Sequence, residues 1–136
     1  MSTADAIRAC LTPGSTIAVV GLSPKPHRDS YRVSQYMQSQ GYRIVPVNPS
    51  ASEVLGERSY ATLREAAAHE NIDVVNCFRN ADDIPPIADE AIAIGAKGLW
   101  LQLGIEHDAA ADKARNAGLQ VVQNRCIMVE HARLKP

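Results

Sequence analysis

Five short runs of apolar residues constrain the fold of this chain more than any other feature of its sequence. Each run is almost continuous in apolar side chains, whereas a strand with one face in water would alternate apolar with polar residues. The predicted strands are residues 16–20, 43–47, 72–76, 98–102 and 119–122. Strands that are buried on both faces are typical of a parallel sheet that is covered by helices.

Segments with helical periodicity separate these strands. The predicted helices are residues 3–11, 30–40, 62–69, 81–94 and 107–117, with a closing amphipathic segment at 127–134. Gly41, Gly95 and Gly118 follow three of them, as is usual at helix C-termini. The alternation predicts an α/β fold, a doubly wound parallel sheet of five strands in the order 3-2-1-4-5, in a single domain spanning residues 1–136.

Pro46 conflicts locally with this scheme because it falls inside the second predicted strand. Proline has no backbone N–H and cannot donate its share of the hydrogen bonds between neighbouring strands. We therefore expect Pro46 either at the end of its strand or in a strand at the edge of the sheet.

The charge balance narrows the classes of partner. With 14 Lys and Arg against 15 Asp and Glu, the net charge of −1 creates no long-range field for nucleic acid or an anionic membrane. No apolar run approaches the ~20 residues of a membrane span, and the N-terminus does not resemble a secretory signal. We expect a cytoplasmic protein that binds neither nucleic acid nor membrane. The three cysteines lack metal-ligand spacing, so we predict no metal site.

Cationic residues gather where the predicted strands end, which is the edge at which open parallel sheets bind ligands. Lys25, Arg28, Arg79 and Arg125 all follow strands. Gly21 allows a close approach of backbone to a ligand, and the amides at the start of the next helix favour a phosphate. Solvated surface charge would explain any one of these cations alone, but the set as a whole predicts a phosphate-bearing ligand.

Two common nucleotide motifs are missing from this edge. The loop after the first strand contains Gly21 but not the G-x-G-x-x-G pattern, and the second strand ends in Val47-Asn48-Pro49 without the acidic residue expected for NAD. An NAD(P)-dependent oxidoreductase is therefore the less favoured alternative. The P-loop pattern G-x-x-x-x-G-K-[ST] is also missing, so the sequence does not support ATP hydrolysis.

The run Val-Val-Gly-Leu-Ser-Pro-Lys-Pro at residues 19–26 resembles the stand-alone CoA-binding protein family. That family is related to the N-terminal CoA-binding domain of the succinyl-CoA synthetase alpha chain. The resemblance extends over nearly the whole chain, through residues 47–49, 56–60, 75–79, 95–97, 100–104 and 124–126. Asn124 departs from it, since the family commonly has an aspartate there, and this leaves the role of that position open.

The resemblance implies a Rossmann-like fold that holds coenzyme A, with its phosphates along the first loop. It implies that Gly21, Ser23, Lys25 and Arg28 contact phosphates, beside the helix start at Ser30. The nucleotide pocket would be shaped by Val47, Asn48 and Pro49, and the next stretch would be lined by Phe78 and Arg79.

The residues predict a non-catalytic module, because no acid/base pair or activated nucleophile is visible. The expected ligand is coenzyme A or an acyl-CoA, and the expected partner is a second copy of the chain or a protein that uses acyl-CoA. A regulatory subunit with a vestigial nucleotide site is a third interpretation. Cys77 and Cys126 both follow strands, so either could form a mixed disulfide with the CoA thiol, although buried structural cysteines are more common.

Overall fold

The computed structural model describes residues 2–135 and contains one parallel sheet of five strands. The strands are β1 (Thr16–Val20), β2 (Arg43–Val47), β5 (Val74–Cys77), β6 (Gly98–Leu101) and β7 (Gln120–Val122). They lie in the order β2-β1-β5-β6-β7, and every neighbouring pair is parallel. The predicted α/β class and the five-stranded parallel sheet are confirmed.

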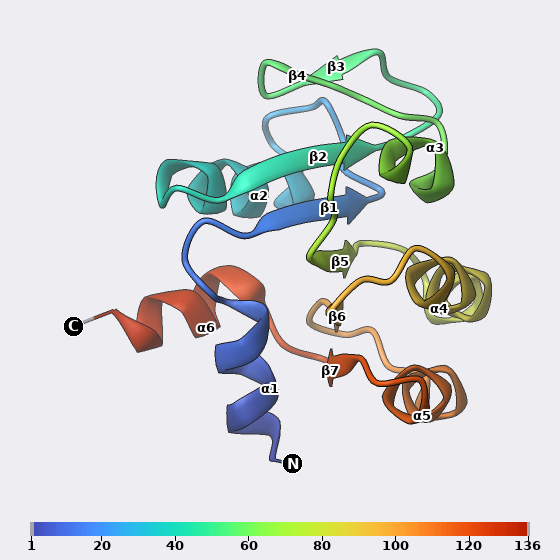
Figure 1. Ribbon diagram of the computed structural model, residues 1–136. Coiled ribbons are helices and arrows are strands. Elements are labelled where there is room, and N and C mark those ends of the chain that lie inside the picture. Colours follow the sequence, from blue (N-terminus) through green and yellow to red (C-terminus); the bar gives the residue numbers. More distant parts are fainter. Residues whose placement is uncertain (1, 136) are drawn as a thin grey trace.

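Helices cover both faces of this sheet (Figure 1). One face carries α1 (Thr3–Cys10), α2 (Asp29–Ser39) and α6 (Ile127–Leu134). The other carries α3 (Leu63–Ala67), α4 (Ile84–Ala93) and α5 (Asp108–Asn116), with a short 3₁₀ turn, Ala81–Asp83, before α4. Successive strand residues point to opposite faces, so Ile17 and Val19 pack against the first group of helices and Ala18 against the second. This two-sided burial explains the continuous apolar runs.

The predicted strand order, 3-2-1-4-5, is wrong, because the third long strand, β5, lies beside β1 and not outside β2. Pro46 supplies the physical reason. Arg43 donates to the Ser15 carbonyl on the β1 side, whereas the Pro46 carbonyl faces outward and accepts the Tyr60 N–H at 3.0 Å. The nitrogen of Pro46, which carries no hydrogen, therefore faces the outer edge of the sheet. A further strand on that side would need an N–H donor at this position. The expected edge placement of Pro46 is confirmed.

A small hairpin follows β2. It was not predicted from the sequence. It consists of β3 (Glu53–Val54) and β4 (Glu57–Arg58), joined by Leu55 and Gly56, which have φ of 54° and 76°. Two consecutive positive φ values are typical of the tight turns that join antiparallel strands. Tyr60, just beyond the hairpin, forms an isolated parallel bridge with Val47 and so covers part of the exposed edge of β2.

Most helix and strand boundaries differ from the predicted ones by one or two residues, and the third helix is shorter than predicted, at Leu63–Ala67. No helix in residues 2–135 has the length and apolar character needed to cross a membrane.

The strand order fixes where a ligand can bind. From β1 the chain turns to α2 on one face, and from β5 it turns to α4 on the other face (Figure 1). Because β1 and β5 are neighbours, these two connections diverge at their carboxyl ends. Such a divergence leaves a crevice beyond the strands, which is the usual ligand site of open α/β sheets.

Candidate functional site

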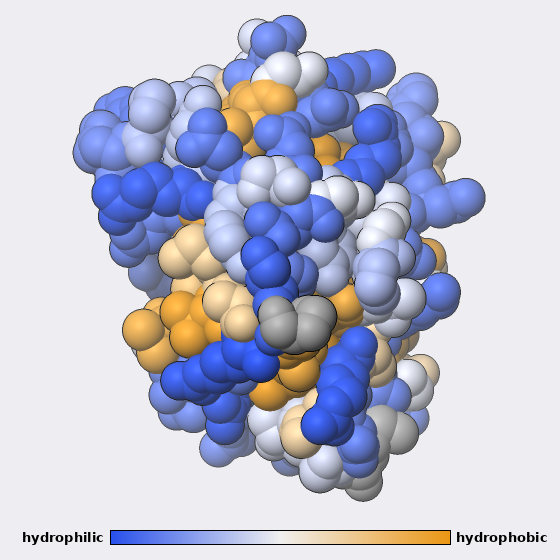
Figure 2. All heavy atoms as spheres, turned by 90° about the vertical axis from the view of Figure 1, so that its left-hand side faces the viewer, coloured by the Kyte–Doolittle hydropathy of each residue, from blue (hydrophilic) through white to orange (hydrophobic). Residues whose placement is uncertain are grey.

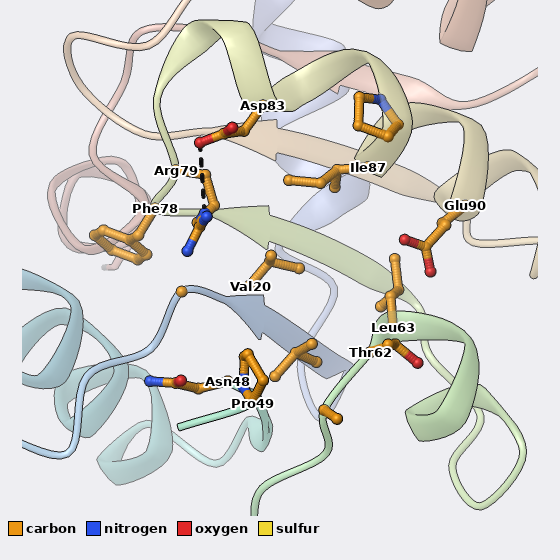
Figure 3. Close-up of a pocket in the computed structure, with 14 residues that line it drawn as sticks. Val20, Asn48, Pro49, Thr62, Leu63, Phe78, Arg79, Asp83, Ile87 and Glu90 are labelled. Carbon is orange, nitrogen blue, oxygen red and sulfur yellow. Dashed lines mark ion pairs between the residues drawn. The ribbon is translucent and has the colours of Figure 1, made fainter. Parts of the chain in front are cut away.

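A cleft with a volume of about 390 Å³ lies where the connections from β1 and β5 diverge. We call it the main cleft. Its walls come from the ends of β1, β2 and β5, from the start of α3 and from one side of α4. The lining residues are Val20, Gly21, Val47, Asn48, Pro49, Ala61, Thr62, Leu63, Phe78, Arg79, Asp83, Pro86, Ile87 and Glu90. Figure 3 shows Arg79 and Ile87 on one side, Asn48 and Pro49 on the other, and Val20 between them.

Gly21 brings the loops after β1 and β5 into close contact. Its φ of +88° lies in the left-handed region, and a Cβ atom built there would be 2.8 Å from the Phe78 carbonyl oxygen and 3.0 Å from Cδ of Arg79. The Phe78 N–H donates to the Val20 carbonyl at 2.9 Å, which holds the two loops together. Only glycine meets both the conformational and the steric requirement at this position.

Arg79 places a positive charge in the main cleft. Its side chain is half exposed, and Nε lies 3.6 Å from a carboxylate oxygen of Asp83 at the start of α4 (Figure 3). Glu90 lies farther along α4, where its carboxylate accepts the Arg64 N–H at 3.2 Å. Arg79 is the only Lys or Arg among the described residues that line this cleft, so an anionic ligand there would meet this guanidinium.

Asn48 links the end of β2 to the loop after β1. Its Nδ2 donates to the Leu22 carbonyl at 2.9 Å, and its Oδ1 accepts the Ser50 N–H at 2.8 Å. The Asn48 carbonyl also accepts the Ser59 hydroxyl at 3.0 Å. The side chain therefore shapes the cleft wall through hydrogen bonds within the protein.

A second cleft of about 350 Å³, which we call the loop cleft, adjoins the main cleft and shares Gly21 and Phe78 with it. It is lined by Gly21, Ser23, His27, Arg28, Asp29, Ser30 and Phe78. The N-terminus of α2 opens here, and its N-cap residue, Arg28, makes no capping hydrogen bond through its side chain. The first backbone N–H groups of α2 and the positive end of the helix dipole are thus available to an anion.

Ser23 and Ser30 hold the loop in shape. The Ser23 N–H donates to Oγ of the buried Ser30 at 3.0 Å, and the Lys25 N–H donates to Oγ of Ser23 at 3.1 Å. Both hydroxyl groups therefore already act as acceptors within the loop. A ligand in the loop cleft would contact a loop that these bonds have already ordered.

The predicted site residues, apart from Lys25, line the main cleft or the loop cleft. Lys25 is exposed and lines neither, so its contact with a phosphate stays a prediction. Arg125 also lies outside both clefts, and its guanidinium is 3.6 Å from a carboxylate oxygen of Glu130. Fewer cations line the two clefts than the sequence indicated.

The sequence did not predict one wall of the main cleft or two residues of the loop cleft. The wall includes Leu63, Asp83, Ile87 and Glu90, and the two loop residues are His27 and Asp29. Apolar spacing in 81–94 did indicate that this helix has a buried face. It gave no sign of which turn faces the ends of β1 and β5, because that depends on the strand order.

Cys77, the last residue of β5, and Cys126, the N-cap residue of α6, differ in accessibility. Cys77 is fully buried, and burial raises the pKa of its thiol to about 12. Cys126 is partly exposed and lines a third cleft, which shares Phe78 and Arg79 with the main cleft. Within residues 2–135, no group of three or more His, Cys, Asp or Glu side chains is arranged to hold a metal ion.

Comparison with known proteins gives matches over almost the whole chain. The family described as "CoA binding domain" matches residues 15–132. The uncharacterized protein YneT of Bacillus subtilis is 39% identical over 126 residues, which are 93% of this chain and 92% of YneT. A solved structure from Thermus thermophilus has a TM-score of 0.88 and 38% identity, covering 99% of this chain and all of that one.

A likeness of fold extends to a dinucleotide-forming acetyl-coenzyme A synthetase of Ca. Korarchaeum cryptofilum. The TM-score is 0.73 and the identity 22%, over 86% of this chain and 28% of the synthetase. The shared feature is therefore the fold of one part of that larger protein.

Proposed function

This chain belongs to the CoA binding domain family, and on that premise we propose that it binds coenzyme A or an acyl-CoA without chemically transforming it. The observation that carries the proposal is the position of Arg79. It lines a cleft at the divergence of β1 and β5, within the residues that the family match covers. Open α/β sheets bind nucleotides at such positions.

The two adjoining clefts suit the two parts of a nucleotide. Apolar side chains of the main cleft, including Val20, Pro49 and Ile87, would pack against the adenine ring. The loop cleft offers Arg28 and the N-terminus of α2 to phosphate groups. Arg79 would lie between them, because Phe78 and Gly21, its neighbours in the main cleft, also line the loop cleft.

The contacts of the polar residues in the main cleft support a non-catalytic role. Of the described residues that line it, none is Cys, His or Ser, and the Thr62 hydroxyl accepts the Glu65 N–H as the N-cap of α3. Of its two carboxylates, Asp83 pairs with Arg79 and Glu90 accepts the Arg64 N–H. Cys77 is the last residue of β5, and its raised thiol pKa keeps it protonated near neutral pH. We propose that the chain holds its ligand in the cytoplasm for a second protein that uses acyl-CoA, or as one of two like subunits.

A thermal-shift or calorimetric titration with CoA, NADP and ATP tests this proposal. CoA at 100 times its dissociation constant should stabilise the fold by ~2.7 kcal/mol, while NADP and ATP at the same concentration should have little effect. Pantetheine alone is the matched control because it lacks the nucleotide, and at the same concentration it should stabilise the protein far less than CoA does. Stabilisation by NADP without stabilisation by CoA would instead favour the oxidoreductase interpretation.

We expect Cys126, and not Cys77, to form a mixed disulfide with oxidised CoA. The Cys126 thiolate would attack one sulfur of the CoA disulfide, so that the S–S bond breaks and one CoA leaves as a thiolate. Cys126 lines a cleft next to the main cleft, whereas burial keeps Cys77 inaccessible and protonated. Intact-mass measurement should find one CoA adduct on the native chain and on Cys77→Ser, but not on Cys126→Ser. An adduct on Cys126→Ser contradicts the expectation.

A further inference from the structure

The third cleft, which we call the side cleft, has a volume of about 430 Å³ and lies between the starts of α2 and α6. Its apolar lining comes from four segments and includes Val33, Leu103, Ile105, Met128 and Val129. Leu103 is 71% exposed and Val129 is 40% exposed, which is unusual for large apolar side chains in this chain. Figure 2 shows hydrophobic residues gathered on the end of the molecule that carries α6.

The side cleft is continuous with the proposed nucleotide site. Phe78 and Arg79 line both the side cleft and the main cleft, and Asp29 lines both the side cleft and the loop cleft. A ligand whose phosphates meet Arg79 could therefore extend directly into the side cleft. Only a ligand with a long apolar or amide-bearing extension beyond its phosphates would use this space.

Among the described residues that line the side cleft, Gln102 is the one buried polar side chain, at 4% exposed, whereas Asp29, Arg32, Arg79 and Asn80 are exposed. Nε2 of Gln102 donates to Oδ1 of the buried Asn76 at 2.8 Å, and among residues 2–135 no hydrogen bond to Oε1 of Gln102 is formed. Within residues 2–135 the one buried side-chain polar atom without a partner is Oγ of Ser34, so Oε1 of Gln102 is accessible from the cleft and can accept a donor from a ligand.

We propose that the side cleft binds the thioester end of an acyl-CoA with an uncharged aliphatic acyl chain. This inference rests on the proposed function and names the class of ligand. Coenzyme A carries amide N–H groups in the arm between its phosphates and its sulfur. One of these amides donates to Oε1 of Gln102, and the acyl chain packs against Leu103 and Val129. Free CoA would leave those apolar side chains in water.

Calorimetric titration of the reduced full-length chain with CoA, acetyl-CoA and hexanoyl-CoA tests this assignment. Burial of part of a six-carbon chain should make hexanoyl-CoA bind about tenfold more tightly than CoA, with acetyl-CoA between them. A double variant, Leu103→Ser with Val129→Ser, should lose this preference and keep its affinity for CoA. Both positions are exposed, so folding should be preserved.

Leu134→Ser is the matched control, because Leu134 is 43% exposed on the same helix as Val129 but lies outside the lining of the side cleft. This variant should keep the preference for hexanoyl-CoA. Equal affinity of the native chain for CoA and hexanoyl-CoA would overturn the inference and leave the proposed function intact. Binding of neither ligand would overturn both. A preference that survives in the double variant would overturn the assignment to the side cleft.

Discussion

Replacing Gly21 with alanine is expected to abolish coenzyme A binding and to destabilise the fold by roughly 2–4 kcal/mol. Two costs add at this position. The residue would be forced to keep a φ of +88°, and its Cβ would lie 2.8 Å from the Phe78 carbonyl oxygen, which is backbone and cannot rotate away. Relief of that contact would separate the loops after β1 and β5, whose close approach forms the floor of the main cleft.

Gly41→Ala is the matched control for this variant. Gly41 has a φ of +93°, almost the same as Gly21, but a Cβ atom there would meet nothing within 4 Å. Gly41→Ala should therefore lose only the stability that a positive φ costs a residue with a Cβ, roughly 1–2 kcal/mol. This variant should bind CoA like the native chain. Denaturant unfolding measures the stability of both variants, and calorimetry measures CoA affinity. Equal destabilisation by the two substitutions, or native affinity in Gly21→Ala, contradicts the role assigned to Gly21.

The sequence predicted the strands well because each is buried on both faces, and continuous apolar runs report that burial directly. It did not yield their order, although Pro46 held the necessary clue. Placing a strand outside β2 requires donors along that edge, and Pro46 has none on the side that faces outward. The predicted order put a third strand on the outer side of β2. If Pro46 must lie in an edge strand, that order is excluded.

The candidate site was predictable where it depends on strand ends and unpredictable where it depends on helix placement. Gly21, Asn48 and Arg79 each follow a strand, and parallel strands bring such residues to one edge. Ile87 and Glu90 line the same cleft as Val20 because β5, the strand that leads into α4, is the neighbour of β1, which is the corrected strand order. Local sequence cannot report a contact that depends on which strands are neighbours.

Asn124 shows how the structure answers a question that the sequence left open. Its φ is 55°, and its Oδ1 accepts the Gly104 N–H at 2.6 Å, which ties together the loops after β6 and β7. Aspartate can also adopt this left-handed conformation and can supply the same acceptor oxygen. The departure from the family's aspartate therefore preserves this hydrogen bond.

Replacing Arg79 with alanine is expected to weaken CoA binding about 10- to 100-fold, the effect of losing a charge-assisted hydrogen bond worth about 1.5–3 kcal/mol. Arg79 is the one Lys or Arg among the described residues that line the main cleft, and it also lines the side cleft. Its half-exposed side chain pairs with Asp83 at the surface, an ion pair of a kind that contributes little to stability, so circular dichroism and thermal unfolding should change little. Calorimetry with CoA measures the loss.

Lys97→Ala and Asp83→Asn separate a direct contact from a general change in charge. Lys97 is exposed and lines none of the three clefts, so Lys97→Ala removes the same formal charge as Arg79→Ala and should weaken binding less than about threefold. Asp83→Asn removes the carboxylate 3.6 Å from Nε of Arg79, which frees the guanidinium and lowers repulsion of phosphate. It should tighten CoA binding a few fold. An equal loss of CoA affinity in Lys97→Ala and Arg79→Ala would mean that the phosphates respond only to the overall charge of the protein. Weaker binding in Asp83→Asn would mean that Asp83 itself contacts the ligand.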